Sequence, residues 1–133
     1  MRMAHSDRDP RKHRHLVWIA VAAGALLTLI GIRFLIVPRT AANNFGLAKD
    51  ALGLSLHHMV GLRDVWLGGL AIVLAILREW RALMWWFALA VPVCLADAAI
   101  AGASSGKLFA VAFHVTSGAI CAAVALAIRS RLR

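Results

Sequence analysis

The sequence predicts an all-α membrane protein: four transmembrane helices in an antiparallel bundle, with the N- and C-termini both on the cytoplasmic side. Apolar residues make up 62% of the 133 residues, and they occur in blocks long enough to cross a hydrocarbon core of about 30 Å. The basic residues between these blocks are distributed unequally, which indicates the orientation. Four tryptophans near the proposed cytoplasmic boundary form the expected aromatic belt, namely Trp18, Trp80, Trp85 and Trp86.

The positive charge of the chain follows from this topology. The net charge is +9, with 15 Lys and Arg residues. Only Arg39, Lys49 and Lys107 lie in the outer connections. Ten lie at the two termini and the middle turn, namely Arg2, Arg8, Arg11, Lys12, Arg14, Arg78, Arg81, Arg129, Arg131 and Arg133. Because cytoplasmic connections carry such an excess, we expect a multi-pass protein of the cell membrane and no nucleic-acid partner.

The first helix is expected over residues 15–37, after a basic cytoplasmic tail at 1–14. It ends there because Pro38 cannot continue the helical hydrogen bonding. Its apolar part is longer than that of a usual secretory signal and no cleavage site follows, so we interpret it as a retained span. The segment 38–53 predicts an amphipathic helix on the outer surface, since its apolar residues recur at helical spacing at Ala41, Phe45, Ala48 and Leu52.

The second helix must begin well before its apolar end, since the 13 residues of 65–77 would reach only about 20 Å. Residues 15–129 then form one four-helix transmembrane domain, with no room for a soluble catalytic module. Its remaining elements are a second helix at 54–77, a turn at 78–81, a third helix at 82–101, a fourth helix at 107–129 and a basic cytoplasmic tail at 130–133.

Three ionisable residues in three different helices share one depth. Counted from the nearest cytoplasmic arginine, Asp64, Asp97 and His114 lie 14, 16 and 15 residues into the membrane. The rise of an α-helix converts these separations to depths of about 21, 24 and 22 Å. Ionisable groups inside a bilayer are costly and mark functional sites by default. This polar layer is the strongest functional signal of the sequence.

Small residues indicate which side of each helix faces the bundle, because close backbone approach drives helix association in membranes. On the second helix such a stripe comprises His57, Gly61, Asp64, Gly68, Ala71 and Ala75. The stripes of the other helices are Ala20, Gly24, Thr28 and Gly31, then Ala90, Cys94 and Asp97, and last Val111, His114, Gly118, Cys121 and Ala125. We therefore expect Asp64, Asp97 and His114 to meet near the bundle axis, with carboxylate–imidazole contacts direct or through one water.

Each of these residues also has a structural interpretation. Asp64 would be merely interfacial if its helix began late, Asp97 would cap backbone freed by Pro92, and His114 would be an ordinary core histidine. A polar cluster that only fixes helix packing is about as well supported as a chemical site. Arg63 lies about 100° from its neighbour on the helix, so we expect it to snorkel to the outer interface or to pair with another helix.

No metal or cofactor pattern is evident. Cys94 and Cys121 lie in different helices without a C-x-x-C motif, so neither a disulfide scaffold nor a redox dithiol is indicated. The adjacent His57 and His58 face different directions and lack a third ligand, so we expect no metal. The candidate catalytic residues are Asp64, Asp97 and His114, and the candidate ligand-binding residues add Arg63 and His57.

The order of these features resembles that of a known group of proteins. It is similar to an uncharacterised family of small four-helix membrane proteins, a domain of unknown function related to the DoxX-like group, in having Pro38, Phe45-Gly46, Gly61-Leu62-Arg63-Asp64, Asp97 and His114 in this order. The resemblance covers roughly residues 15–129 and implies a fold and a residue set but no reaction. DoxX-like relatives are connected with membrane redox and quinone-associated processes, which implies an accessory oxidoreductase role, although this chain lacks the paired cysteines of a direct thiol role.

Three functions compete. The one we favour is a binding or accessory role for a lipid-like or quinone-like ligand in the bilayer. The second is a membrane-embedded acid–base enzyme, an isomerase or cyclase, in which two carboxyls with different pKa values act on an apolar substrate. The third is a small proton-coupled transporter, which the lack of an acid in the first helix disfavours. The expected partners are the lipid bilayer and an apolar small molecule, and exposed small-residue stripes would allow a homodimer.

Overall fold

The computed structural model describes residues 14–48 and 53–132. These residues form five helices and contain no β-strand. The helices are α1 (Arg14–Ile36), α2 (Pro38–Phe45), α3 (Leu54–Ile76), α4 (Trp80–Ser104) and α5 (Leu108–Leu132).

Four of these helices, α1, α3, α4 and α5, are 23 to 25 residues long and apolar enough to cross a membrane. Most of the large apolar side chains on their outer sides are exposed, including Trp66, Leu89 and Leu126. Such a surface is unusual in a soluble monomer but suits contact with lipid chains. The all-α fold with four membrane-spanning helices is therefore confirmed.

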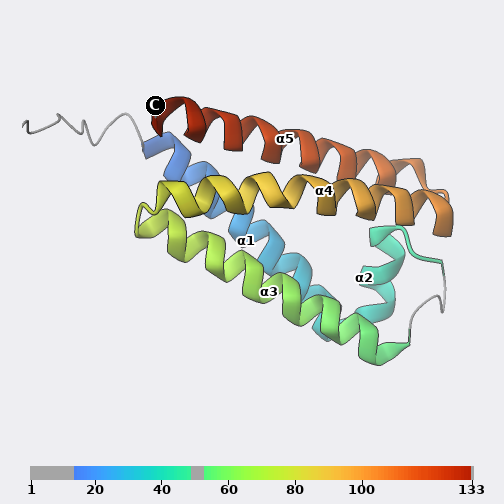
Figure 1. Ribbon diagram of the computed structural model, residues 1–133. Coiled ribbons are helices and arrows are strands. Elements are labelled where there is room, and N and C mark those ends of the chain that lie inside the picture. The colour runs from blue at the N-terminus through green and yellow to red at the C-terminus, as the bar shows by residue number, and fades with distance from the viewer. Residues whose placement is uncertain (1–13, 49–52, 133) are drawn as a thin grey trace, which may run out of the picture.

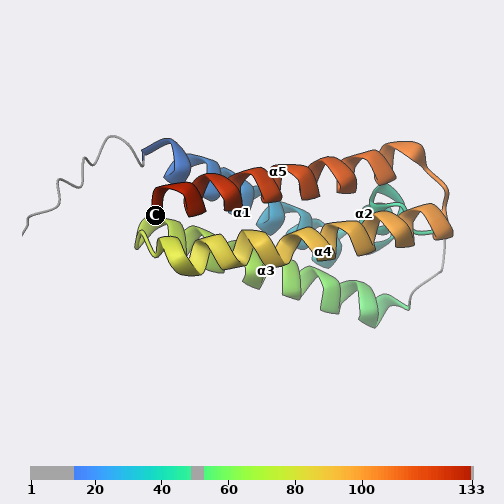
Figure 2. The ribbon, with the colours of Figure 1, turned by 45° about the horizontal axis from the view of Figure 1, so that its top comes forward.

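The four long helices associate as two pairs rather than as one evenly packed bundle (Figures 1 and 2). Helix α1 lies along α3, and α4 lies along α5, while α3 and α4 touch far less. Helix α1 begins at the end of the molecule where α5 ends, and α2 lies at the opposite end.

The α1–α3 pair is held together by glycines that face each other. A Cβ atom added at Gly24 would lie 2.7 Å from the backbone oxygen of Gly68, and one added at Gly31 would lie 2.6 Å from that of Gly61. The two backbones therefore touch directly, as small-residue stripes allow in membranes. On α3 the prediction is confirmed in full, because the buried residues are His57, Gly61, Asp64, Gly68, Ala71 and Ala75.

The α4–α5 pair is built around larger side chains near the turn that joins α3 to α4. Leu83 and Phe87 on α4 are fully buried in one cluster with Ile128 on α5. The buried residues of α5 include the predicted His114, Gly118 and Ala125. On α4, by contrast, the predicted face of Ala90, Cys94 and Asp97 is only half-buried.

Helix α2 is shorter and more buried than the predicted surface helix. Pro38 begins it, and it ends before Gly46, whose φ of 102° is left-handed and favours glycine. Ala48 therefore lies beyond the helix, and Leu52 lies outside the described residues. Ala41 and Ala42 are buried against Phe34 and Leu47, so one face of α2 packs onto the protein.

Helix α2 and the loop after it form hydrogen bonds with the end of α4 and the turn between α4 and α5. The Lys107 Nζ donates to the Asn43 backbone oxygen at 3.0 Å and also contacts the Asn43 side chain. The backbone N–H of Ala48 donates to the Ser104 hydroxyl at 2.9 Å. These bonds hold α2 and the loop after it against the α4–α5 pair at one end of the molecule.

Candidate functional site

Asp64 is a buried carboxylate paired with its neighbour in sequence. Its residue is 3% exposed, and the Arg63 Nε donates to its Oδ1 at 3.0 Å. The expectation that Arg63 would turn to the interface or to another helix was therefore wrong. The arginine side chain is long enough to bend back along the helix, and burial of the carboxylate makes a charged partner valuable.

Arg63 itself remains accessible. Its side chain is 46% exposed, and only one of its five N–H groups is used by the bond to Asp64. The guanidinium therefore fixes the buried carboxylate and still presents donors outward from α3.

His57 has a structural role at the start of α3. Its Nδ1 donates to the Gly53 backbone oxygen at 3.0 Å, and its ring stacks on Phe34 of α1 with centroids 6.2 Å apart. The ring N–H is used in this bond to the backbone at the start of α3. His57 is therefore not part of the Arg63–Asp64 ion pair.

His114 joins α5 to α2. Its Nε2 donates to the backbone oxygen of Phe45 at 3.1 Å, and its ring lies edge-on to the Phe45 ring with centroids 4.3 Å apart. Phe45 is the last residue of α2, where carbonyl groups lack partners inside the helix. The predicted direct carboxylate–imidazole contact is thus replaced by this bond, because α2 places a free carbonyl against the imidazole.

Asp97 is the half-buried carboxyl of α4. It lies within electrostatic range of His114 on α5 and of Arg63 and Asp64 on α3. Within residues 14–48 and 53–132 its carboxyl makes no hydrogen bond or ion pair. The structural interpretation, in which Asp97 bonds to backbone freed by Pro92, therefore has no counterpart in the described residues.

Cys94 and Cys121 lie near each other where α4 packs against α5, which the sequence analysis did not anticipate. A Cβ atom added at Gly118, one turn before Cys121, would lie 3.2 Å from the Cβ of Cys94, and both cysteines are half-buried with free thiols. A spacing of 27 residues carries no motif, and only the pairing of α4 with α5 brings the two residues near each other.

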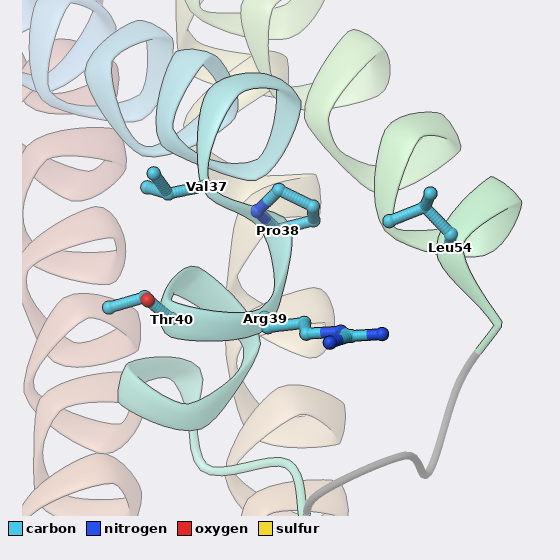
Figure 3. A pocket seen from close by; sticks show the side chains of 5 residues that line it. All are labelled: Val37, Pro38, Arg39, Thr40 and Leu54. Atoms are coloured by element: carbon cyan, nitrogen blue, oxygen red, sulfur yellow. The ribbon is translucent and has the colours of Figure 1, made fainter.

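A pocket of about 320 Å³ lies away from the polar layer, where α1 meets α2 (Figure 3). It is shallow and mostly apolar, and the Arg39 side chain extends across it toward Leu54 of α3. Its lining residues are Val37, Pro38, Arg39, Thr40 and Leu54.

Metal ligands are not grouped in the part of the chain that the structure describes: no cluster of three His, Cys, Asp or Glu side chains could hold an ion there. The polar layer offers guanidinium donors and carboxylate acceptors instead. These groups suit hydrogen bonding and proton exchange with an organic ligand.

Four helices long and apolar enough to cross a membrane define a small multi-pass membrane protein. The chain belongs to the family described as Domain of unknown function (DUF4267), whose model matches residues 24–128. The matched range includes Arg63, Asp64, Asp97 and His114. No curated protein and no solved structure is significantly similar to the chain. The link to the DoxX-like group stays a prediction.

Proposed function

We propose that the protein binds an apolar molecule with a polar head, lipid-like or quinone-like, and that the head lies at the layer of Arg63, Asp64, Asp97 and His114. The observation that carries this proposal is the state of Asp97. Its carboxyl lies within a membrane-spanning helix and has no hydrogen-bond or ion-pair partner in the described residues. A polar group left unmatched in a low-dielectric region is costly, and a ligand would remove that cost.

The polar side chains of this layer indicate which head group the ligand would carry. The N–H groups of Arg63 that do not bond to Asp64 would donate to a carbonyl, ether or phosphoryl oxygen, and the Asp97 carboxyl would accept from a hydroxyl group. Asp64 fixes the guanidinium at 3.0 Å, so the donors are pre-oriented before a ligand arrives. His114 is engaged with Phe45 and would border the site rather than hold the head.

The position of the layer supports entry from the bilayer. Arg63 and Asp64 belong to the α1–α3 pair, whereas Asp97 belongs to the α4–α5 pair, and the two pairs contact each other weakly. A ligand that bridges α3 and α4 would therefore leave both well-packed pairs intact. Its apolar part would lie against exposed side chains such as Leu62 and Trp66.

Native mass spectrometry of protein extracted in mild detergent tests the binding. We expect an apolar adduct on the native chain that is lost in Asp97→Asn. Glu79→Gln is the matched control, since Glu79 is an exposed acid in the turn before α4, and this variant should keep the adduct. A protein without any apolar adduct, or an adduct held equally by both variants, would contradict the proposal.

A second function, an acid–base isomerase or cyclase, is favoured by one observation. The two carboxyls have different surroundings: Asp64 is paired with Arg63, whereas Asp97 has no such partner within residues 14–48 and 53–132. Such a difference lets one acid stay ionised while the other carries a proton. Turnover of an apolar substrate that is lost in Asp97→Asn would distinguish an enzyme from a binding protein.

We also propose that the protein lies in the cell membrane with both termini in the cytoplasm. The support is the division of basic residues between the two ends of the bundle and the position of α2, which lies opposite the start of α1 and the end of α5.

A further inference from the structure

The pocket at the junction of α1 and α2 contains a cation that the described part of the protein leaves unpaired. Of its described lining residues, Val37, Pro38, Arg39, Thr40 and Leu54, only Arg39 carries a charge. The Arg39 side chain extends across the pocket toward Leu54 (Figure 3). Within residues 14–48 and 53–132 its guanidinium makes no hydrogen bond or ion pair. Its N–H donors are therefore available to an anion at the pocket.

The length of α1 places this cation at the level of the lipid head groups. Helix α1 has 23 residues, which corresponds to about 34 Å, slightly more than a hydrocarbon core of about 30 Å. Arg39 follows Ile36, the last residue of α1, by three positions. Its guanidinium therefore lies just outside the hydrocarbon core, where the phosphate groups of lipids also lie.

The rest of the pocket is apolar and open toward the bilayer. Val37 and Leu54 are 43% and 56% exposed, and Ile36, next in sequence to Val37, is 73% exposed. The pocket is shallow, with a volume of about 320 Å³, so it would cover only a small part of a dissolved ligand. A lipid needs less enclosure, because the bilayer already holds its chains and keeps its head group near the pocket at high effective concentration.

Positive charge is concentrated around this pocket. Arg33 is exposed and lies one turn before Val37 on the same face of α1, and a long arginine side chain near a helix end reaches the membrane interface. The first turn of α2 has no side-chain cap, so the backbone N–H groups of Arg39 and Thr40 add to the positive potential. A phosphate without a cationic group of its own matches these surroundings better than a zwitterionic head group does.

We propose that this pocket binds the phosphate of an anionic phospholipid, such as phosphatidylglycerol, from the leaflet at the α2 end of the molecule. The Arg39 guanidinium donates to two phosphate oxygens, which its planar fork of N–H groups matches. The glycerol and the first acyl carbons lie against Val37, Pro38 and Leu54. This site is separate from the polar layer around Asp97, so it goes beyond the proposed function.

The test uses the full-length protein in phosphatidylcholine liposomes that contain a small fraction of a photoactivatable phosphatidylglycerol, with a diazirine near the start of one acyl chain. After illumination the protein is digested, and the labelled residues are mapped by mass spectrometry. We expect residues 36–40 and Leu54 to be labelled more than Leu126, an exposed apolar residue of α5. A phosphatidylcholine probe with the same diazirine should show no such enrichment.

Matched variants identify the group that holds the lipid. Arg39→Gln should lose the enrichment, whereas Arg39→Lys, which keeps the charge, should retain part of it. Both variants should fold, because Arg39 is exposed and unpaired among the described residues, and circular dichroism checks this. Arg81→Gln should keep the enrichment, since Arg81 is an exposed arginine at the start of α4, at the opposite end of the molecule from α2.

The outcomes decide between this lipid and other occupants. Enrichment that is unchanged in Arg39→Gln, or equal for the two lipid probes, would overturn the proposal. Removal of the enrichment by water-soluble glycerol 3-phosphate would show that the pocket takes a dissolved anion, and would overturn the lipid as its occupant. Asp97→Asn should leave the enrichment intact, so the proposed function can fail without affecting this site.

Discussion

Two adjacent glycines of α3 give a sharp test of the α1–α3 pair. A Cβ atom at Gly68 would lie 2.5 Å from the Gly24 backbone oxygen and 2.7 Å from the Thr28 backbone nitrogen. A Cβ atom at Gly69 would meet nothing within 4 Å. The same substitution to alanine, one residue apart in the same helix, should therefore have opposite effects.

The magnitude follows from what must move. The atoms that block Gly68 are the Thr28 hydroxyl and two backbone atoms of α1. The hydroxyl could rotate away, but the backbone atoms cannot, so the clash is relieved only if α1 and α3 separate. Extra volume in a well-packed interface typically costs about 1–3 kcal/mol, and Gly68→Ala should destabilise the fold by that amount. Gly69→Ala adds no clash and removes a glycine from a helix interior, so it should stabilise by up to about 1 kcal/mol.

The measurement is unfolding of both variants and the native protein in the same detergent, followed by the loss of helical circular dichroism. Gly69→Ala is the internal control for any general effect of alanine on α3. Equal stability of the two variants would refute the direct backbone contact between α1 and α3.

Three further predictions concern the polar residues and the topology. Asp64→Asn should lower the free energy of unfolding by about 1–2 kcal/mol, less than the roughly 3–5 kcal/mol of a fully buried broken pair, because the half-exposed Arg63 can turn to solvent. Asp97→Asn breaks no bond among the described residues, so its free energy of unfolding should stay within about 0.5 kcal/mol of the native value. His114→Phe should cost about 1–3 kcal/mol by leaving the Phe45 carbonyl without a donor, and hydrogen exchange should rise first in α2. Reporter fusions after residue 133 and within 38–56 should report opposite sides of the membrane, and the same side for both would overturn the orientation.

Periodicity predicted the faces of the helices but not their partners. The six-residue stripe of α3 was predictable because small residues at helical spacing report where a backbone can be approached. The same signal exists on α1, and it cannot say that α1 pairs with α3 rather than with α5. The arrangement in two pairs depends on contacts between segments distant in the sequence.

The candidate site was predictable in its residues and not in its bonds. Asp64, Asp97 and His114 stood out because ionisable groups are rare in apolar helices. The partner of His114 is a backbone carbonyl 69 residues away, and every residue has a carbonyl, so no sequence pattern marks that one. The Arg63–Asp64 bond depends on a side-chain conformation, and the proximity of Cys94 to Cys121 depends on the packing of α4 against α5.

Photocrosslinking with an apolar diazirine probe that carries a carbonyl head tests the central claim most directly. The probe is activated in membranes containing the native protein, and labelled peptides are mapped with and without excess unlabelled decylubiquinone. Binding at the polar layer predicts labels that compete away on α3 near Arg63 and on α4 near Asp97, and their loss in Asp97→Asn. Labels spread evenly over exposed apolar residues such as Leu29 and Leu126, unchanged by competitor or substitution, would contradict it.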